Sequence, residues 1–321
     1  AHKSGVPMTI AKIALAAIFS LTSAVAQAAG TYTYSFSFVS GDEARGAVGL
    51  ATDAGRNVYV ADSNNNEVDV FSQDGAYLRS IRDPRYYGLN TPVTLAVGAD
   101  DRVHVYSSNG KNIQTYDREG TRLNEFTHNG SSFFNLRSSS QLSVDAKGEV
   151  LVPIFQEGTI DAYDKDGHFL RSFGDGQLYY PLGLTHDLQG NVLVYDTRGG
   201  TGSLGRILTF SPEGKLLSSF SNLKHDGNAL AVDKEGNILL ATTWSVHRYS
   251  ATGSFIDSIY LNGAMLRGGI AVDADNRLLV TAFDSYRGQV HVFTSSVPEP
   301  SSWMLLIAGL GITPLIRRRL C

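Results

Sequence analysis

The stretch GLATDAGRNVYVADSNNNEVDVFSQDGAYLRSI, residues 49–81, is the first of six similar segments in this chain. Short apolar runs alternate in it with clusters of Gly, Asn, Asp and Ser, a pattern typical of β-strands joined by tight turns. The other five segments begin at Thr94, Gln141, Gly183, Ala229 and Gly269. Corresponding positions recur every 40 to 47 residues, which indicates a repeat protein.

Each segment divides into four short strands. The first strand is apolar, as in GLATD, and the second strand alternates, as in NVYVAD. The turn between the third and fourth strands holds a glycine at Gly75, Gly120, Gly167, Gly214 and Gly253. The turn between the first two strands is closed by Gly148, Gly190, Gly236 or Asn276, residues that tolerate a positive φ. Four-stranded repeats of this length predict an all-β fold, a six-bladed β-propeller.

The chain also predicts how the propeller closes. The sixth segment ends after its third strand, near Phe293, whereas residues 34–53 align with the end of the third segment and the start of the fourth. We therefore expect residues 32–39 to supply the missing fourth strand of the last blade. Such a closing strand removes open sheet edges in a chain whose one cysteine, Cys321, cannot form an intramolecular disulfide.

The repeat resembles the NHL repeat, whose pattern is roughly GIAVD, GNIYVAD, VF and FL followed by FG. The first segment matches it best, with VYVAD at 58–62 and VF at 70–71, and the resemblance covers most of residues 29–296. The resemblance implies a domain that binds protein, RNA or glycan. Some proteins of this kind are instead enzymes, either lyases or lactonases.

The two chain ends have the character of targeting segments. Lys12, an apolar run and the sequence Ala26-Gln27-Ala28 predict a signal peptide over residues 1–28, with an upstream extension before Met8 and cleavage after Ala28. The alternative is a buried N-terminal helix. Residues 29–296 would then form the exported propeller.

Residues 297–321 combine Pro298-Glu299-Pro300, an apolar run to Ile316, and Arg317, Arg318 and Arg319. This order resembles the PEP-CTERM sorting signal of Gram-negative bacteria. The resemblance implies a hydrophobic helix in the inner membrane and processing by an exosortase. The exported protein would then reach the cell surface or the exopolysaccharide matrix. The alternative is a permanent C-terminal membrane anchor.

Residues 29–296 contain 22 Lys and Arg against 30 Asp and Glu, a net charge of −8. An acidic body disfavours nucleic acid and anionic membrane surfaces as partners, so we expect membrane contact only through the C-terminal segment.

Repeated carboxylates and scattered histidines are the candidates for chemistry. One aspartate ends the first strand in five segments, at Asp53, Asp145, Asp187, Asp233 and Asp273, and we expect these to cap turns. We expect Asp62 and Asp196, which follow second strands, to be structural as well. Only His186 is placed to approach the propeller axis. The sequence therefore predicts neither catalytic residues nor a cofactor, with Ca²⁺ or Zn²⁺ expected only if the protein is a metal-dependent enzyme.

The candidate binding residues are aromatic and arginine side chains in the connections at one face of the propeller. They are Arg85, Tyr86, Tyr87, Phe133, Phe134, Arg137, Tyr179, Tyr180, Trp244, Tyr286 and Arg287. Side chains of these types anchor many binding surfaces, although connections that bridge blades can also bury them. The sequence favours a non-catalytic module that binds a protein or polysaccharide of the envelope or matrix. The alternatives are a metal-dependent lyase or hydrolase with a site on the axis, and a purely structural matrix protein.

Overall fold

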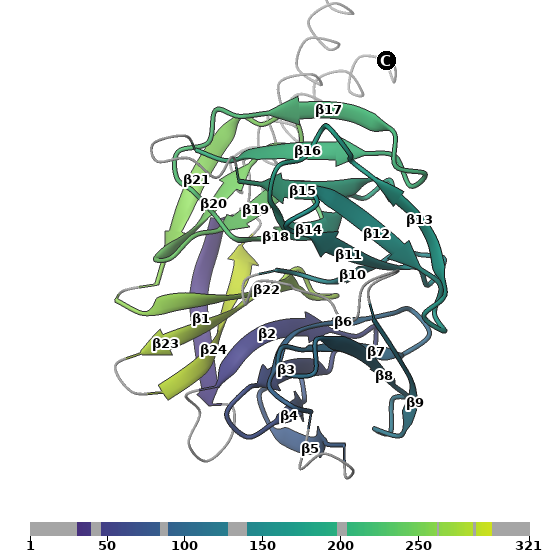
Figure 1. Ribbon diagram of the computed structural model, residues 1–321. Helices are drawn as coiled ribbons and strands as arrows, with labels where there is room; N and C mark the ends of the chain where they lie inside the picture. Colours follow the sequence, from purple (N-terminus) through teal and green to yellow (C-terminus); the bar gives the residue numbers. More distant parts are fainter. Residues whose placement is uncertain are drawn as a thin grey trace, which may run out of the picture. The chain divides into compact units, whose positions relative to one another are not determined.

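The chain forms a six-bladed β-propeller, as the repeats predict. The computed structural model describes residues 31–39, 46–83, 89–127, 140–197, 204–261, 263–284 and 287–296. These residues contain 24 strands in six four-stranded antiparallel sheets, and residues Tyr32–Thr294 make one compact unit. Figure 1 shows the first strands β2, β6, β14 and β18 toward the centre and the fourth strands β5, β9, β13, β17 and β21 at the periphery.

Each blade is built in chain order from its inner strand to its outer strand. Blade 1 contains β2 (Ala47–Thr52), β3 (Val58–Asp62), β4 (Glu67–Phe71) and β5 (Tyr77–Ile81). Blade 2 contains β6 (Pro92–Val97), β7 (Val103–Ser107), β8 (Asn112–Tyr116) and β9 (Arg122–Phe126). Blade 3 contains β10 (Ser143–Val144), β11 (Val150–Ile154), β12 (Thr159–Tyr163) and β13 (Phe169–Phe173).

The next two blades repeat this order. Blade 4 contains β14 (Pro181–His186), β15 (Val192–Asp196), β16 (Arg206–Phe210) and β17 (Leu216–Phe220). Blade 5 contains β18 (Ala229–Val232), β19 (Ile238–Ala241), β20 (Ser245–Tyr249) and β21 (Phe255–Tyr260).

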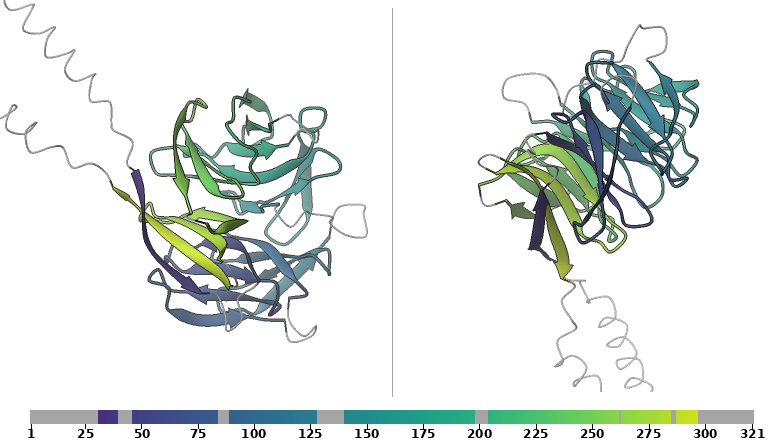
Figure 2. Two further views of the ribbon diagram at one scale, coloured as in Figure 1. Left: turned by 90° about the vertical axis from the view of Figure 1, so that its left-hand side faces the viewer. Right: turned by 90° about the horizontal axis from the view of Figure 1, so that it is seen from below.

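Blade 6 confirms the predicted closure. It contains β22 (Met265–Val272), β23 (Leu278–Asp284), β24 (Arg287–Ser296) and, as its outer strand, β1 (Thr31–Val39). The purple β1 lies alongside the yellow β24 in Figure 2, although the two strands come from opposite ends of the chain. The N-terminal strand thus completes the last sheet.

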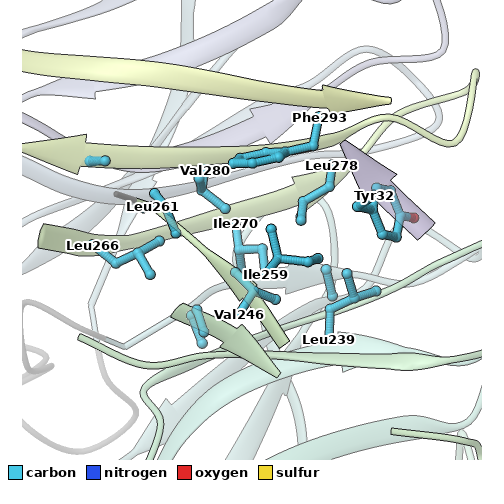
Figure 3. Close-up of a cluster of buried hydrophobic side chains, with 14 of the residues drawn as sticks. Tyr32, Leu239, Val246, Ile259, Leu261, Leu266, Ile270, Leu278, Val280 and Phe293 are labelled. Carbon is cyan, nitrogen blue, oxygen red and sulfur yellow. The ribbon is translucent and has the colours of Figure 1, made fainter. Parts of the chain in front are cut away.

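Each pair of neighbouring blades encloses one hydrophobic cluster, so the described residues hold six such clusters. Figure 3 shows the cluster between blades 5 and 6, where Tyr32 of β1 lies near Leu278 of β23 and Leu239 of β19. The hydroxyl of Tyr32 donates to Asn276 Oδ1 at 3.5 Å, and the Arg248 guanidinium lies 5.5 Å from its ring centroid. The closing strand is therefore anchored in the core as well as by its backbone.

The alternation seen in the second strands does not give them a solvent-exposed face. All five residues of β3, β7, β11 and β15 are buried, and so are all residues of the third strands β4, β8, β12 and β20. A propeller sheet is covered on both faces by the adjacent blades, so side chains on both faces enter a core. The outer strands of these blades have exposed positions along their length, as in β5 and β17.

The turn glycines have the backbone that the repeats predict. The five glycines between third and fourth strands have φ between 80° and 91°, and Asn276 has φ 61°. In blades 1 and 2 the corresponding left-handed position of the first turn is filled by Arg56 and Asp101, which the sequence did not suggest.

These turn glycines also connect blades. A Cβ added to Gly167 would lie 2.5 Å from the ring of Phe126, and one on Gly214 would lie 2.5 Å from Cβ of Phe173. Phe126 and Phe173 end the outer strands of the preceding blades. The recurring aromatic residue and the recurring glycine are therefore two sides of one contact between blades.

Candidate functional site

The connections at one end of the blades form a surface that we name the loop face. It comprises the segments that lead from a fourth strand to the next first strand and the turns between second and third strands. Backbone hydrogen bonds join these two kinds of segment: Leu89 N donates to Asn66 O at 2.6 Å, and Ser108 N donates to Thr91 O at 2.9 Å. The opposite end, which carries the other hairpin turns, is the turn face.

Three of the predicted binding residues have described side chains: Tyr179, Tyr180 and Trp244. Arg287 begins β24, and only its backbone is described. The remaining candidates lie outside the described residues. They are Arg85, Tyr86, Tyr87, Phe133, Phe134, Arg137 and Tyr286.

Tyr179 is presented to solvent by a buried carboxylate. Its side chain is 57% exposed, whereas Asp196 at the end of β15 is fully buried. Oδ1 of Asp196 accepts the backbone N–H groups of Tyr179 and Tyr180 at 2.9 and 2.7 Å. This carboxylate oxygen fixes the backbone of the connection between blades 3 and 4.

The second oxygen of Asp196 holds an arginine beneath the same tyrosine. Oδ2 accepts Nε and Nη2 of Arg206 at 3.0 and 2.9 Å, which makes a buried ion pair. The Arg206 guanidinium lies 5.1 Å from the centroid of the Tyr179 ring, and Arg206 also donates to the carbonyl of Gln177. Tyr179 is therefore held at its backbone and supported at its ring.

Tyr180 serves a different purpose from its neighbour. Its ring stacks on Phe155, with a centroid distance of 4.7 Å and an interplanar angle of 27°. Phe155 follows β11 in blade 3, so the pair packs one blade against the next. Of the two adjacent tyrosines, Tyr179 is a surface residue and Tyr180 is half-buried between blades.

Trp244 lies in the short turn between β19 and β20 and is 55% exposed. The hydroxyl of Thr242 accepts the backbone N–H groups of Trp244 and Ser245 at 3.4 and 3.3 Å. The turn is joined to β22 of the next blade because Leu266 N donates to Thr243 O at 2.9 Å. Trp244 is thus a second exposed aromatic residue on the loop face.

A histidine pair joins the connection before blade 5 to the third strand of that blade. The rings of His225 and His247 stack with centroids 4.8 Å apart and an angle of 16°. His247 is in β20 and bonds Ser258 Oγ through Nδ1 at 2.7 Å. Burial, and then the nearby His225 and Lys224, lower the pKa of His247 to about 4, so this ring is uncharged at neutral pH.

The repeated aspartates are structural, as expected. Asp187 Oδ1 accepts the backbone N–H groups of Gln189 and Asn191 at 2.9 and 2.8 Å, and Asp53, Asp145, Asp233 and Asp273 close their turns in the same way. Asp62 caps the turn after β3 through Asn64 and Asn65. These carboxylates are occupied by turn backbone and do not converge as a catalytic ring.

A cavity of about 260 Å³ lies on the propeller axis and is lined by the first strands of all six blades. His186 lines it, which confirms the expected approach of this residue to the axis. Its Nδ1 lies 2.9 Å from Ser143 Oγ of the neighbouring blade, and burial lowers its pKa. Within the part of the chain that the structure describes, no three His, Cys, Asp or Glu side chains are grouped so that they could hold a metal ion.

Two side chains important for these sites were missed in the sequence. Arg206 had no distinguishing signal, because an arginine after a glycine-rich segment is unremarkable by itself. Gln141 did have a distinguishing signal. It occupies the position of Gly49, Thr94, Gly183 and other small residues in the aligned segments. A long polar side chain at a position of small residues was a visible exception.

The predicted sorting and cleavage residues lie outside the described residues. They are Ala26, Ala28, Pro298, Glu299, Pro300, Arg317, Arg318 and Arg319. Among the described residues, no helix has the length and apolar character that a membrane crossing requires.

The fold defines the chain as a six-bladed β-propeller. No protein-family model matches it. It is similar to the protein brain tumor of Drosophila melanogaster, with 29% identity over 139 residues, which is 42% of this chain and 13% of that protein. An NHL-like repeat is consistent with this similarity, which extends over a small part of the relative.

Solved structures with the same architecture include two enzymes. Virginiamycin B lyase from Staphylococcus aureus has a TM-score of 0.61 and 11% identity, covering 83% of this chain and 100% of that chain. A gluconolactonase from Xanthomonas campestris has a TM-score of 0.61 and 18% identity, covering 84% and 98%. At these identities the similarity establishes the fold alone.

Proposed function

We propose that this protein is an exported, non-catalytic binding module that recognises a protein or a glycan through its loop face. The observation that carries the proposal is the placement of Tyr179, an exposed aromatic ring fixed by the buried Asp196 and supported by Arg206. Trp244 adds a second exposed aromatic side chain on the same face.

A preorganised, exposed aromatic residue contributes more to binding a partner than to the stability of the fold. An exposed tyrosine contributes little to folding, since its ring remains in water. Because the Tyr179 backbone and ring are already held, binding would lose little conformational entropy when a partner covers the ring. Tyr, Trp and Arg are also the residues that contribute most to affinity at interfaces.

The cellular context of the proposal comes from the chain ends. The signal-peptide pattern of residues 1–28 and the PEP-CTERM-like residues 297–321 support export across the inner membrane of a Gram-negative bacterium and processing by an exosortase. The binding partner would then be a component of the envelope or of the extracellular polymer matrix.

The test is a binding screen of the full chain against an array of bacterial polysaccharides and envelope proteins, followed by titration of each hit. Tyr179→Ala should weaken a loop-face hit by about tenfold or more, because an aromatic anchor is worth roughly 1.4 kcal/mol or more. Asp196→Asn should also weaken it, because Arg206 loses its charge partner and the supporting contacts loosen.

The matched control is Tyr77→Ala. Tyr77 is 58% exposed, almost the same as Tyr179, but it lies in the outer strand β5. Equal loss of affinity in both variants would show that binding does not use the loop face. Absence of any saturable hit would contradict the proposal.

Metal analysis on the same sample distinguishes the binding module from the enzymatic alternative. A stoichiometric, tightly held Ca²⁺ or Zn²⁺, together with no saturable binding of polymer, would favour a metal-dependent lyase or hydrolase on the axis.

A further inference from the structure

The axial cavity is narrow at its loop-face end because the first strands approach one another there. A Cβ added to Gly49 would lie 2.7 Å from Cα of Thr94, and one on Gly269 would lie 2.5 Å from the carbonyl oxygen of Val48. Both distances are shorter than any side chain tolerates. Glycine at the start of these strands lets neighbouring blades come together at the axis.

Gln141 completes this constriction where blade 3 has the shortest first strand. Its Oε1 accepts the backbone N–H groups of Leu184 and Leu230 at 3.1 and 2.6 Å, and its Nε2 donates to Leu230 O at 3.1 Å. One side chain therefore joins blades 3, 4 and 5. It also satisfies backbone groups on strand edges that no further strand covers.

The cavity is more open to solvent at the turn face. Along the first strands, Leu50, Leu184 and Leu230 are buried, whereas the last residue before the turn is partly exposed in every blade. These mouth residues are Thr52, Val97, Val144, His186, Val232 and Val272. A molecule that enters the cavity would therefore come from the turn face.

His186 is the exception among the mouth residues. Four of the other five are valine, and His186 is the one titratable side chain among the residues that line the cavity. Its Nδ1 bonds Ser143 Oγ, and its Nε2 has no hydrogen-bond partner among the described residues. A buried nitrogen without a hydrogen-bond partner is unfavourable, so a histidine is a costly choice at a position where four other blades have valine.

We propose that the turn-face end of the cavity binds a small uncharged molecule that carries hydroxyl groups, no larger than a monosaccharide, at the Ser143–His186 pair. The hydroxyl and the neutral imidazole can each donate or accept a hydrogen bond. No Asp, Glu, Lys or Arg lines the cavity to compensate an ionic ligand. The cavity volume of about 260 Å³ lies just below the roughly 300 Å³ at which pockets for drug-sized ligands begin, which sets the upper size.

The experiment titrates the full chain, labelled at histidine, with glycerol, D-glucose, D-galactose and D-mannose, and follows the His186 ring signals by NMR. The His186 signals are identified as those that disappear in His186→Val. This variant has the residue that four other blades carry at the same position, so we expect it to fold. We expect a saturable shift of the His186 signals with at least one probe. Thermal-shift titration of the wild type under the same conditions should give the same affinity. We expect no thermal shift in His186→Val and an affinity at least tenfold weaker in Ser143→Ala.

Two controls keep this site separate from the loop face. His168→Gln removes an exposed histidine in a turn of blade 3 and should leave probe binding unchanged. Tyr179→Ala should also leave it unchanged, so failure of the loop-face proposal does not affect this one. Absence of a saturable His186 shift with every probe, which leaves the cavity to water alone, would overturn the inference. Equal affinity in His186→Val would overturn it as well.

Discussion

Single residues in this propeller take their role from what surrounds them. Asp187 and Asp196 are nine positions apart in the same blade, and both accept two backbone N–H groups through one oxygen. Asp187 closes a local turn, whereas Asp196 reaches a connection from the preceding blade and an arginine. The first role was predictable from the position of an aspartate before a turn. The second depends on residues 16 and 17 positions away and was not.

The same contrast separates the two tyrosines of one connection. Tyr179 and Tyr180 are identical in chemistry and adjacent in sequence, so they were proposed together. The structure exposes Tyr179 above Arg206 and stacks Tyr180 on Phe155 of the preceding blade.

His104 provides a prediction at the residue scale, because burial lowers its pKa from 6.5 to about 4. The folded state then resists protonation that the unfolded state accepts. The contribution to stability is complete above pH 6.5 and is lost as the pH falls from 6.5 to 4. The total loss is about 3 kcal/mol at 1.36 kcal/mol per pH unit. Urea unfolding at several pH values should show that His104→Gln, which can still bond Thr115, loses less stability over this range than the wild type.

The control for this prediction is His168→Gln. His168 is exposed, and the neighbouring Asp164 raises its pKa, the opposite direction to His104. This variant should keep the acid sensitivity of the wild type. If His104→Gln loses as much stability as the wild type between pH 6.5 and 4, His104 is not a source of the acid sensitivity.

At the scale of elements, the hairpin turns separate two reasons for a glycine: a left-handed backbone and close contact with a neighbouring blade. Gly167 and Gly148 both have a left-handed backbone, with φ 87° and 82°. A Cβ on Gly148 would meet nothing within 4 Å, whereas one on Gly167 would lie 2.5 Å from the Phe126 ring. The first glycine is required by its backbone alone, and the second also by a neighbouring blade.

Gly148→Ala should therefore cost about 1–2 kcal/mol, the strain of a left-handed alanine. Gly167→Ala should cost about 1–3 kcal/mol more, because Phe126 must move. The difference in the free energy of unfolding, measured with urea, isolates the contact between blades. Equal costs would mean that Phe126 moves aside freely and that this contact does not hold the blades together.

The second and third strands show that polar residues within a strand do not mark a solvated face in this fold. Alternation predicts one polar face, as in a sheet with water on one side. Here buried polar residues such as Asp161 and Thr115 sit within fully buried strands and hydrogen-bond to other side chains, Tyr163 and His104 respectively. Polar positions in these strands were satisfied internally and did not mark a solvated face.

At the scale of the whole molecule, the closing strand β1 decides whether the six blades form one ring. Deleting residues 1–39 removes Tyr32, Phe36 and Phe38 from the clusters on either side of blade 6. It also exposes the edge of β24, a row of unpaired backbone groups. Tyr32 is buried and the two phenylalanines are partly buried, so at about 1–2 kcal/mol each their removal makes a loss of more than about 3 kcal/mol.

Light scattering after gel filtration, together with thermal unfolding, tests this prediction. The deletion should unfold at a temperature lower by on the order of 10 °C and should associate through the open edge. Deletion of residues 1–30, which keeps β1, is the matched control and should remain like the full chain. A deletion of 1–39 that stays monomeric with an unchanged midpoint would show that the ring does not depend on β1.

The sequence by itself determined the number of blades, their four-strand order, the turn glycines and the closure by the N-terminal strand. These follow from a period and from local backbone rules, which one chain of residues contains in full. Only the tertiary structure decided which side chains are surface and which are core: Tyr179 against Tyr180, Asp196 against Asp187, and His186 with Ser143 at the axial cavity. Those differences arise between blades, where residues distant in sequence meet, and no local pattern carries that information.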